Sequence, residues 1–394
     1  MLRFPVNSLA ARLEAFLREV RQSHGQSLRM PIKLDLGGGL GGAVQAVQVI
    51  ATWARLHDSG RPLTLSSSFA SSEATRTRFA STVPGMAALY FAGSIDCEGT
   101  PLDRYSALEA VAPRVEAMQR EEFQDTLRGV GTALCCFMGA RNEYLKPLYE
   151  IPEPGHVRED GDFRLLLPRM LSGLSGGKMA KLNEGQLDYL SALVYQLFLN
   201  ADQHGAYDVS GARYSPGVRG ITARLTVLDD VTSLIRYAGD DRALRVYLAR
   251  LGARRTLDPA DGVGKAPLPG GPMHIVEISV FDTGPGLGLR WLSGELGAQS
   301  YGDFSEEEEL DAVHTCFAKH TTTKASQYFG QGLTVALMAL KRLNAFMTLR
   351  TGRLSLYQDF SHGVTDEFNP KKRFGKRRVS EIAGTGYTIC FRVK

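Results

Sequence analysis

Residues 274–288 read HIVEISVFDTGPGLG. Their first eight positions are mostly apolar, which predicts a buried strand over residues 274–281. Asp282 follows at the end of this strand, where its carboxylate can accept a hydrogen bond from an exocyclic amine. Gly284 and Gly286 then let the backbone approach a flat ring, because they carry no Cβ. Taken alone, the stretch predicts a nucleotide-base site and an ordinary glycine turn equally well.

A second polar pattern lies upstream, near the end of a helix predicted over residues 182–204. Residues 196–205 read QLFLNADQHG, so Gln196, Asn200 and His204 are spaced four apart and share one helical stripe. The amide oxygen of Asn200 is a hard ligand of the kind that Mg²⁺ accepts. The alternative is a polar stripe that faces solvent.

A third pattern leads into another predicted helix, where residues 319–333 read KHTTTKASQYFGQGL. Gly330 and Gly332 leave backbone amides free at the N-terminus of that helix, where the helix dipole and hydrogen bonds favour a triphosphate. Thr323 and Lys324 would then lie over the phosphates as part of a mobile lid. The alternative is an ordinary surface loop.

The order of these three stretches resembles the GHKL superfamily, which includes the ATP-binding part of DNA gyrase, the ninety-kilodalton heat-shock chaperones, sensor histidine kinases and mismatch-repair ATPases. The resemblance covers roughly residues 182–394. It maps the family's motifs onto Gln196, Asn200 and His204 (N box), Asp282, Gly284 and Gly286 (G1 box), and Gly330, Gly332 and Leu333 (G2 box). The resemblance implies that the chain binds ATP with Mg²⁺, that Asn200 ligates the metal, and that Asp282 binds the adenine amine.

Gln196 departs from the family pattern, because many members place there a glutamate that activates the attacking water or hydroxyl. A glutamine cannot take a proton at neutral pH and can only orient the nucleophile. We therefore expect hydrolysis to be slow, to use another base, or to be absent. His204 is one candidate base, although a structural hydrogen-bonding role is favoured. The family's final-strand threonine has two candidates, Thr385 and Thr388, and neither is assigned.

The chain lies between subfamilies of this resemblance. NADQHG at residues 200–205 resembles the N box of the anti-sigma-factor serine kinases, whereas TTTK at residues 321–324 resembles the mismatch-repair and gyrase-like members. Our hypothesis is therefore an ATP-gated conformational switch with slow hydrolysis, and by analogy alone a component of a prokaryotic regulatory, stress or phage-defence system. The alternatives are a serine/threonine protein kinase of the anti-sigma-factor type and a catalytically degenerate ATP-binding module.

The length of 394 residues allows two or three domains. Residues 1–165 alternate strand, glycine turn, helix and strand, which predicts a small α/β domain of βαβ type, STAS-like or otherwise partner-binding. Residues 178–394 are expected to form a GHKL-type α/β sandwich, a mixed sheet covered by helices on one face, with a helical insertion at about 230–251. The glycine cluster GGGLGG at 37–42 completes no phosphate-loop motif, and a tight strand-to-helix turn explains it as well.

Composition argues against several function classes. With 43% hydrophobic and 22% charged residues the chain is ordinary and globular, and its net charge of +4 gives no global case for binding nucleic acid. The local exception is NPKKRFGKRR at 369–378, where a solvated hairpin loop is favoured over a nucleic-acid contact through Lys371–Arg378. Five cysteines without a CxxC pair, and the lack of a signal sequence or long apolar run, predict a cytoplasmic protein without membrane contact.

Overall fold

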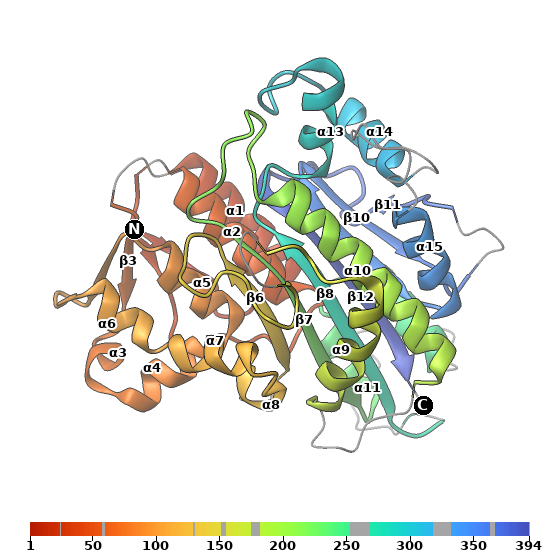
Figure 1. The fold of residues 1–394 in the computed structure, drawn as a ribbon, viewed down its shortest axis with the longest axis horizontal. Helices are drawn as coiled ribbons and strands as arrows, with labels where there is room; N and C mark the ends of the chain where they lie inside the picture. Colours follow the sequence, from red (N-terminus) through yellow and green to blue (C-terminus); the bar gives the residue numbers. More distant parts are fainter. Residues whose placement is uncertain are drawn as a thin grey trace.

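The computed structural model shows an α/β protein with two β-sheets and helices packed against them (Figure 1). This confirms the predicted fold class. The structure describes residues 1–23, 25–56, 60–128, 131–150, 155–174, 182–252, 268, 270–317, 332–362 and 367–393, with the backbone alone for residues 332–335.

The smaller sheet is formed by the N-terminal part of the chain. In the described residues it has five strands in the order β1-β2-β3-β4-β5. Neighbours from β1 to β4 are parallel and β5 is antiparallel to β4, so this sheet is mixed. Its strands are β1 (Leu2–Arg3), β2 (Leu28–Arg29), β3 (Pro62–Leu65), β4 (Ser94–Cys97) and β5 (Pro101–Leu102). The helices of this part are α1 (Ala10–Gln22), α2 (Gly42–Arg55), α3 (Ser67–Ser71), α4 (Glu73–Ala80), α5 (Val83–Phe91), α6 (Arg104–Glu109), α7 (Ala112–Gln119) and α8 (Phe123–Thr126).

The larger sheet carries the region of the predicted site. Its seven described strands lie in the order β11-β10-β9-β12-β8-β7-β6, and every neighbouring pair is antiparallel. They are β6 (Thr132–Phe137), β7 (Val218–Leu228), β8 (Met273–Asp282), β9 (Phe346–Gly352), β10 (Leu354–Asp359), β11 (Lys371–Lys372) and β12 (Ile382–Val393). The mixed sheet predicted for residues 178–394 is therefore antiparallel, and the mixed one lies in the N-terminal part.

Helices cover both faces of the larger sheet, where the sequence predicted one covered face. On one face lie α10 (Glu184–Gly205) and, packed against it, α9 (Asp160–Ser172) and α15 (Gly332–Arg342), as Figure 1 shows. On the other face α2 packs on β12, alongside α11 (Val231–Ala238) and α12 (Arg242–Leu251). These last two helices form the predicted insertion at 230–251. The remaining helices are α13 (Leu287–Leu296) and α14 (Glu306–Phe317).

The long helix α10 forms where the apolar pattern predicts it. Asn183 caps its N-terminus, accepting a hydrogen bond from the Gln186 backbone, while the Gln186 side chain accepts one in return from the Asn183 backbone. Its apolar residues recur every three or four positions and are buried against the sheet and α15. They are Leu190, Leu193, Val194, Leu197, Phe198 and Ala201.

The two predicted domains share one continuous hydrophobic core. Strand β6, which the sequence places within residues 1–165, pairs with β7 at the edge of the larger sheet. Helix α2 is tied to the sheet by Gln48, which donates to the carbonyls of Arg350 (3.1 Å) and Ala383 (3.2 Å). Glu14 of α1 pairs with Arg350, also in the buried interior. The buried residues before and after the predicted boundary near residue 165 thus belong to the same core.

None of the described helices is both long and apolar enough to cross a membrane.

The side-chain hydroxyl of Thr52 joins α2 to the larger sheet by one hydrogen bond. Thr52 is buried, and its Oγ1 accepts a hydrogen bond from the Ala383 backbone amide at 2.8 Å. We expect Thr52→Val to lower the free energy of unfolding by about 1–2 kcal/mol, because the Ala383 amide is left buried without a partner. Thr100→Val, on an exposed turn, should change it by less than about 0.5 kcal/mol. Equal effects in chemical denaturation would show that the hydrogen bond does not stabilise this junction.

Candidate functional site

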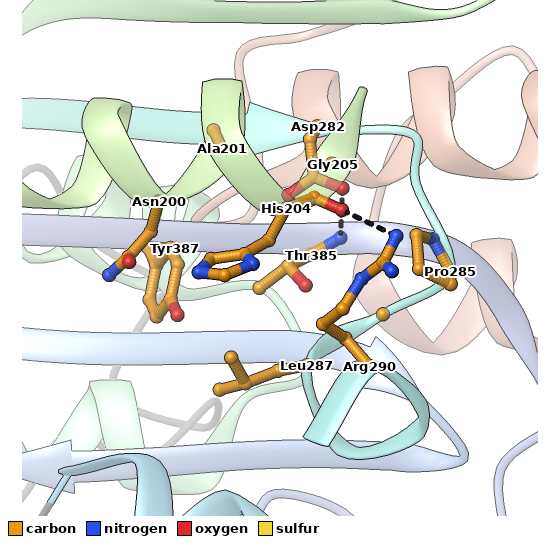
Figure 2. Close-up of a pocket in the computed structure, with 11 residues that line it drawn as sticks. Asn200, Ala201, His204, Gly205, Asp282, Pro285, Leu287, Arg290, Thr385 and Tyr387 are labelled. Atoms are coloured by element: carbon orange, nitrogen blue, oxygen red, sulfur yellow. Dashed lines mark hydrogen bonds between the residues drawn. The ribbon is translucent and has the colours of Figure 1, made fainter. Parts of the chain in front are cut away.

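The predicted motifs meet in a pocket between α10, the turn after β8, the start of α13 and β12 (Figure 2). It encloses about 320 Å³, counting its open mouth. We call it the Asp282 pocket. Its lining residues are Asn200, Ala201, His204, Gly205, Asp282, Pro285, Gly286, Leu287, Arg290, Thr385 and Tyr387.

Asp282 is the buried charge of this pocket, with 5% of its surface exposed. Its Oδ1 accepts hydrogen bonds from the backbone amides of Gly284 (2.7 Å) and Thr385 (3.3 Å). In the described part of the chain no group donates to its Oδ2. Burial raises the pKa of Asp282 to about 6, although the two amides and the nearby Arg55 and Arg290 favour the charged form. At neutral pH the pocket therefore holds a carboxylate with one oxygen left to accept a hydrogen bond.

Two glycines bring the backbone of α10 against the turn that carries Asp282. A Cβ on Gly205 would lie 2.4 Å from the Cβ of Asp282, and one on Gly284 would lie 2.6 Å from the Cα of Gly205. Neither position has room for a side chain, because the clashing atoms belong to backbone or to the buried aspartate. The glycine turn predicted from the sequence is thus required by this close contact, and Gly286 lines the pocket beside it.

The polar stripe predicted on α10 divides in the structure. Asn200 and His204 line the pocket, and Figure 2 shows both side chains on the side of α10 that faces Tyr387 and Thr385. Gln196, one turn earlier, is half-buried and is not among the lining residues. Among the described residues of the lining, Asp282 is the only carboxylate.

The two threonines left open by the sequence lie on opposite faces of the larger sheet. Thr385 lines the pocket, and its Oγ1 lies 3.2 Å from that of Thr351. Thr388 lies three residues further along β12, where its Oγ1 is 2.8 Å from the Ser279 hydroxyl on the α2 face. The structure therefore brings Thr385 to Asp282 and leaves Thr388 away from the pocket.

The predicted phosphate-binding segment is described only at its end. Thr323, Lys324 and Gly330 lie outside the described residues. Gly332 begins α15, and Leu333 lies in its first turn with the side chain outside the described part.

Arg290 joins α10 to α13, and no sequence pattern marked it. Its Nη2 donates to the carbonyls of His204 (3.2 Å) and Asp208 (2.9 Å), and also to that of Tyr207. These carbonyls lie at and just beyond the C-terminus of α10, where a cation is favoured by the helix dipole. Arg290 thus fixes the end of the helix that carries Asn200 and His204.

Arg55 reaches the same turn from the N-terminal part of the chain. At the end of α2, its Nη1 donates to the carbonyl of Gly284 at 2.9 Å and its Nη2 to that of Thr283. Its guanidinium stacks on the ring of Tyr214, 3.8 Å from the ring centroid. Burial lowers the pKa of Arg55, whereas the neighbouring Tyr214 and Asp282 raise it. A residue from the N-terminal part therefore fixes the backbone of the turn that follows Asp282. No local sequence pattern predicts this contact.

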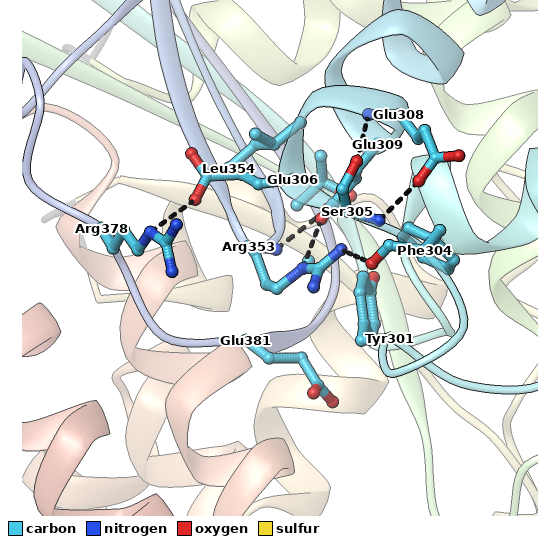
Figure 3. A network of polar contacts seen from close by, with 12 residues as sticks. Tyr301, Phe304, Ser305, Glu306, Glu308, Glu309, Arg353, Leu354, Arg378 and Glu381 are labelled. Carbon is cyan, nitrogen blue, oxygen red and sulfur yellow. Dashed lines mark hydrogen bonds and ion pairs between the residues drawn. The ribbon is translucent and has the colours of Figure 1, made fainter.

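A second network of polar contacts surrounds the start of α14, as Figure 3 shows, and Tyr301 joins this region to the pocket. Tyr301 donates to the carbonyl of Pro285 at 2.7 Å. Glu309 of α14 is fully buried and accepts hydrogen bonds from the amide and the Nε of Arg353, both at 2.9 Å. Burial raises the pKa of Glu309, and its bonds with Arg353 oppose that rise. The helix that precedes the predicted lid is thus joined to the turn between β9 and β10.

The glycine cluster at 37–42 is a structural turn. Gly39 donates its amide to the carbonyl of Tyr237 at 2.9 Å, and the amide of Gly41 donates to the Glu277 carboxylate at 3.3 Å. The anion at the N-terminus of α2 is therefore a side chain of the protein. This favours the tight turn over the phosphate loop.

Metal binding at this site would depend on few protein atoms. The described residues contain no group of three or more His, Cys, Asp or Glu side chains that could hold a metal ion. Asn200 offers one amide oxygen at the pocket, which suits an ion that keeps waters and binds phosphates as its other ligands.

Comparison of the chain with known protein families, curated proteins and solved structures finds no match.

The raised pKa of Asp282 predicts how stability depends on pH. A carboxyl that ionises near pH 3.9 in the unfolded chain and near pH 6 in the folded one binds protons more tightly when folded. Its contribution to the free energy of unfolding therefore falls as pH rises from about 4 to about 6, by roughly 3 kcal/mol in total. We expect Asp282→Asn to remove this slope and to equal or exceed the wild-type stability at pH 7.5. Urea denaturation at pH 5 and pH 7.5 measures both effects. A variant markedly less stable than wild type at pH 7.5 would show that the carboxylate has a structural role.

Proposed function

We propose that the chain is a Mg²⁺-ATP-binding protein of the GHKL type, in which nucleotide in the Asp282 pocket acts as a conformational switch. The observation that carries this proposal is the buried carboxylate with one oxygen held by two backbone amides and the other open to hydrogen bonding. A buried charge whose pKa is strongly shifted, at the base of a pocket, is typical of a functional site. An exocyclic amine supplies the donor that the second oxygen lacks.

In this proposal three parts of the chain would hold ATP. Asp282 would accept the hydrogen bond from the adenine amine in the pocket beside the close contact of Gly205 with Gly284. Asn200 would ligate Mg²⁺, which neutralises charge on the phosphates. The amides at the start of α15, at Gly332, would face the phosphates, because helix N-termini favour anions.

The contacts around the pocket support a switch. Arg55 holds the carbonyls of the turn, and Arg290 holds the end of α10. Tyr301 links the same turn to the segment before α14. A ligand that binds better to one arrangement of these elements shifts the protein towards it. Because Arg55 belongs to α2, such a shift would reach the N-terminal part, where we place the protein partner.

The pocket supports slow or absent hydrolysis. Its only described carboxylate is assigned to adenine, and Gln196 does not line it. His204 remains as the titratable side chain at the pocket. A catalytically degenerate ATP-binding module is therefore the second candidate.

All five cysteines are free thiols and four are buried, which supports our placing the protein in the cytoplasm.

Calorimetric titration with Mg²⁺-ATP at pH 7.5 tests the proposal. We expect wild type to bind ATP, and Asp282→Asn to weaken binding about 10- to 100-fold, because a hydrogen bond to a charged group contributes about 1.5–3 kcal/mol. Asn200→Ala should abolish most of the Mg²⁺ dependence. GTP should bind much more weakly than ATP, because guanine carries a carbonyl where adenine carries its amine. Asp311→Asn, an exposed change on α14, is the matched control and should bind as wild type does.

The titration, together with an assay that follows the γ-phosphate of labelled ATP, separates the alternatives. Equal binding of ATP and GTP, unaffected by Asp282→Asn, would contradict the proposed pocket. Tight binding with no product over hours would identify a binding module. Phosphate that appears on a partner protein and not in solution would identify a protein kinase.

A further inference from the structure

A basic groove lies between α12 and the edge formed by β10 and β11. It encloses about 1310 Å³ counting its open mouth, against about 320 Å³ for the Asp282 pocket. The groove lies on the α12 face of the larger sheet, and the pocket lies on the α10 face. Its basic lining residues are Arg242, Arg250, His362, Lys371, Lys372 and Arg373.

Two walls that are distant in sequence supply these charges. Arg242 and Arg250 come from α12, whereas Lys371, Lys372 and Arg373 come from the basic loop and β11. A solvated hairpin alone, the interpretation favoured from the sequence, would not account for a second basic wall facing the first. The sequence could not show this, because about 120 residues separate the two walls.

Some of these cations have structural roles. The side chain of Arg373 is buried and pairs with Asp241 at 2.5 Å, and Arg250 pairs with Asp359 at 2.6 Å. Lys372 pairs with Glu306 at 2.5 Å. Neutralising every basic residue of the loop would therefore break the fold of the hairpin as well as any binding surface.

The remaining cations of the groove are available to a ligand. Arg242 and Lys371 are exposed, and neither forms an ion pair with another described residue. Lys376 and Arg377 are also exposed, in the segment that follows β11, but they do not line the groove. Three of the five lysines and arginines of the lining are thus paired with acids, and Arg242 and Lys371 are the two that are not paired with a described residue. The groove thus carries two cations that are free to meet an anionic ligand, one on each wall.

We propose that this groove binds the phosphodiester backbone of a nucleic acid. Its positive charges come from two separate walls, which suits a ligand with repeated negative charges. Because the groove lies on the other face of the sheet, this proposal does not depend on nucleotide in the Asp282 pocket.

Fluorescence anisotropy with labelled 20-nucleotide single-stranded DNA, double-stranded DNA and single-stranded RNA, at 50 to 200 mM salt, tests the proposal. We expect Arg242→Glu with Lys371→Glu to weaken binding at least about 10-fold for every sequence and to reduce the salt slope by about 1 to 2, because two phosphate contacts are lost. The matched control is Arg141→Glu with Lys146→Glu, an equal charge change at exposed residues beyond the opposite edge strand β6. The control should change binding less than about 2-fold.

Several results would overturn the proposal. They are no binding of any of the three nucleic acids at 50 mM salt, an equal loss in the control variant, or polyglutamate competing as well as nucleic acid does. The milder Arg242→Gln with Lys371→Gln must show a smaller loss in the same direction, and thermal unfolding must be unchanged in both groove variants. Asp282→Asn should bind nucleic acid as wild type does, so a failure of the nucleotide proposal is distinguished from a failure of this one.

Discussion

Asp282 places a carboxylate out of water at the end of the central strand β8, and the surrounding backbone is arranged about that charge. Burial opposes ionisation, and only two backbone amides bond directly to the carboxylate among the described residues. The contact between Gly205 and Gly284 closes α10 onto the turn and leaves no room for a side chain there. A protein selected for stability alone would place an apolar residue at this position, which supports our proposal that the charge belongs to a binding site.

The arginines near Asp282 donate hydrogen bonds to backbone carbonyls and affect the carboxylate only through their charge. Arg290 holds the end of α10, and Arg55 holds the carbonyls of Thr283 and Gly284. As a result the second oxygen of Asp282 stays open while the turn is fixed from two sides. Arg55 also makes the pocket depend on α2, whose other contacts, through Gln48 and Thr52, reach β9 and β12. The N-terminal part and the larger sheet are therefore joined by these contacts, and we propose that a ligand at the turn acts on α2 through Arg55.

Local patterns predicted the elements of the site, and long-range pairing decided how they meet. The predicted strand at 274–281 and helix at 182–204 correspond to β8 and α10 within two residues, because each has a clear apolar period. Strand β6 pairs with β7, and α2 packs on the second face of the larger sheet. Both contacts join segments that are distant in sequence, so no local pattern predicts them. Thr385 and Thr388 are three residues apart, so their side chains lie on opposite faces of the sheet. Which of them faces Asp282 depends on the strand register, and β12 is irregular between Ile382 and Thr385. Arg55 was missed because its contact with the turn is equally long-range.

Hydrogen–deuterium exchange with and without Mg²⁺-ATP tests most directly whether the Asp282 pocket is coupled to the N-terminal part of the chain. The account predicts slower amide exchange in residues 282–287 and, in the same experiment, in the last turns of α2 that end at Arg55. Without Mg²⁺-ATP these segments should exchange faster, because the turn then lacks its ligand. Protection that is confined to the turn, or that is absent from both segments, would contradict the account.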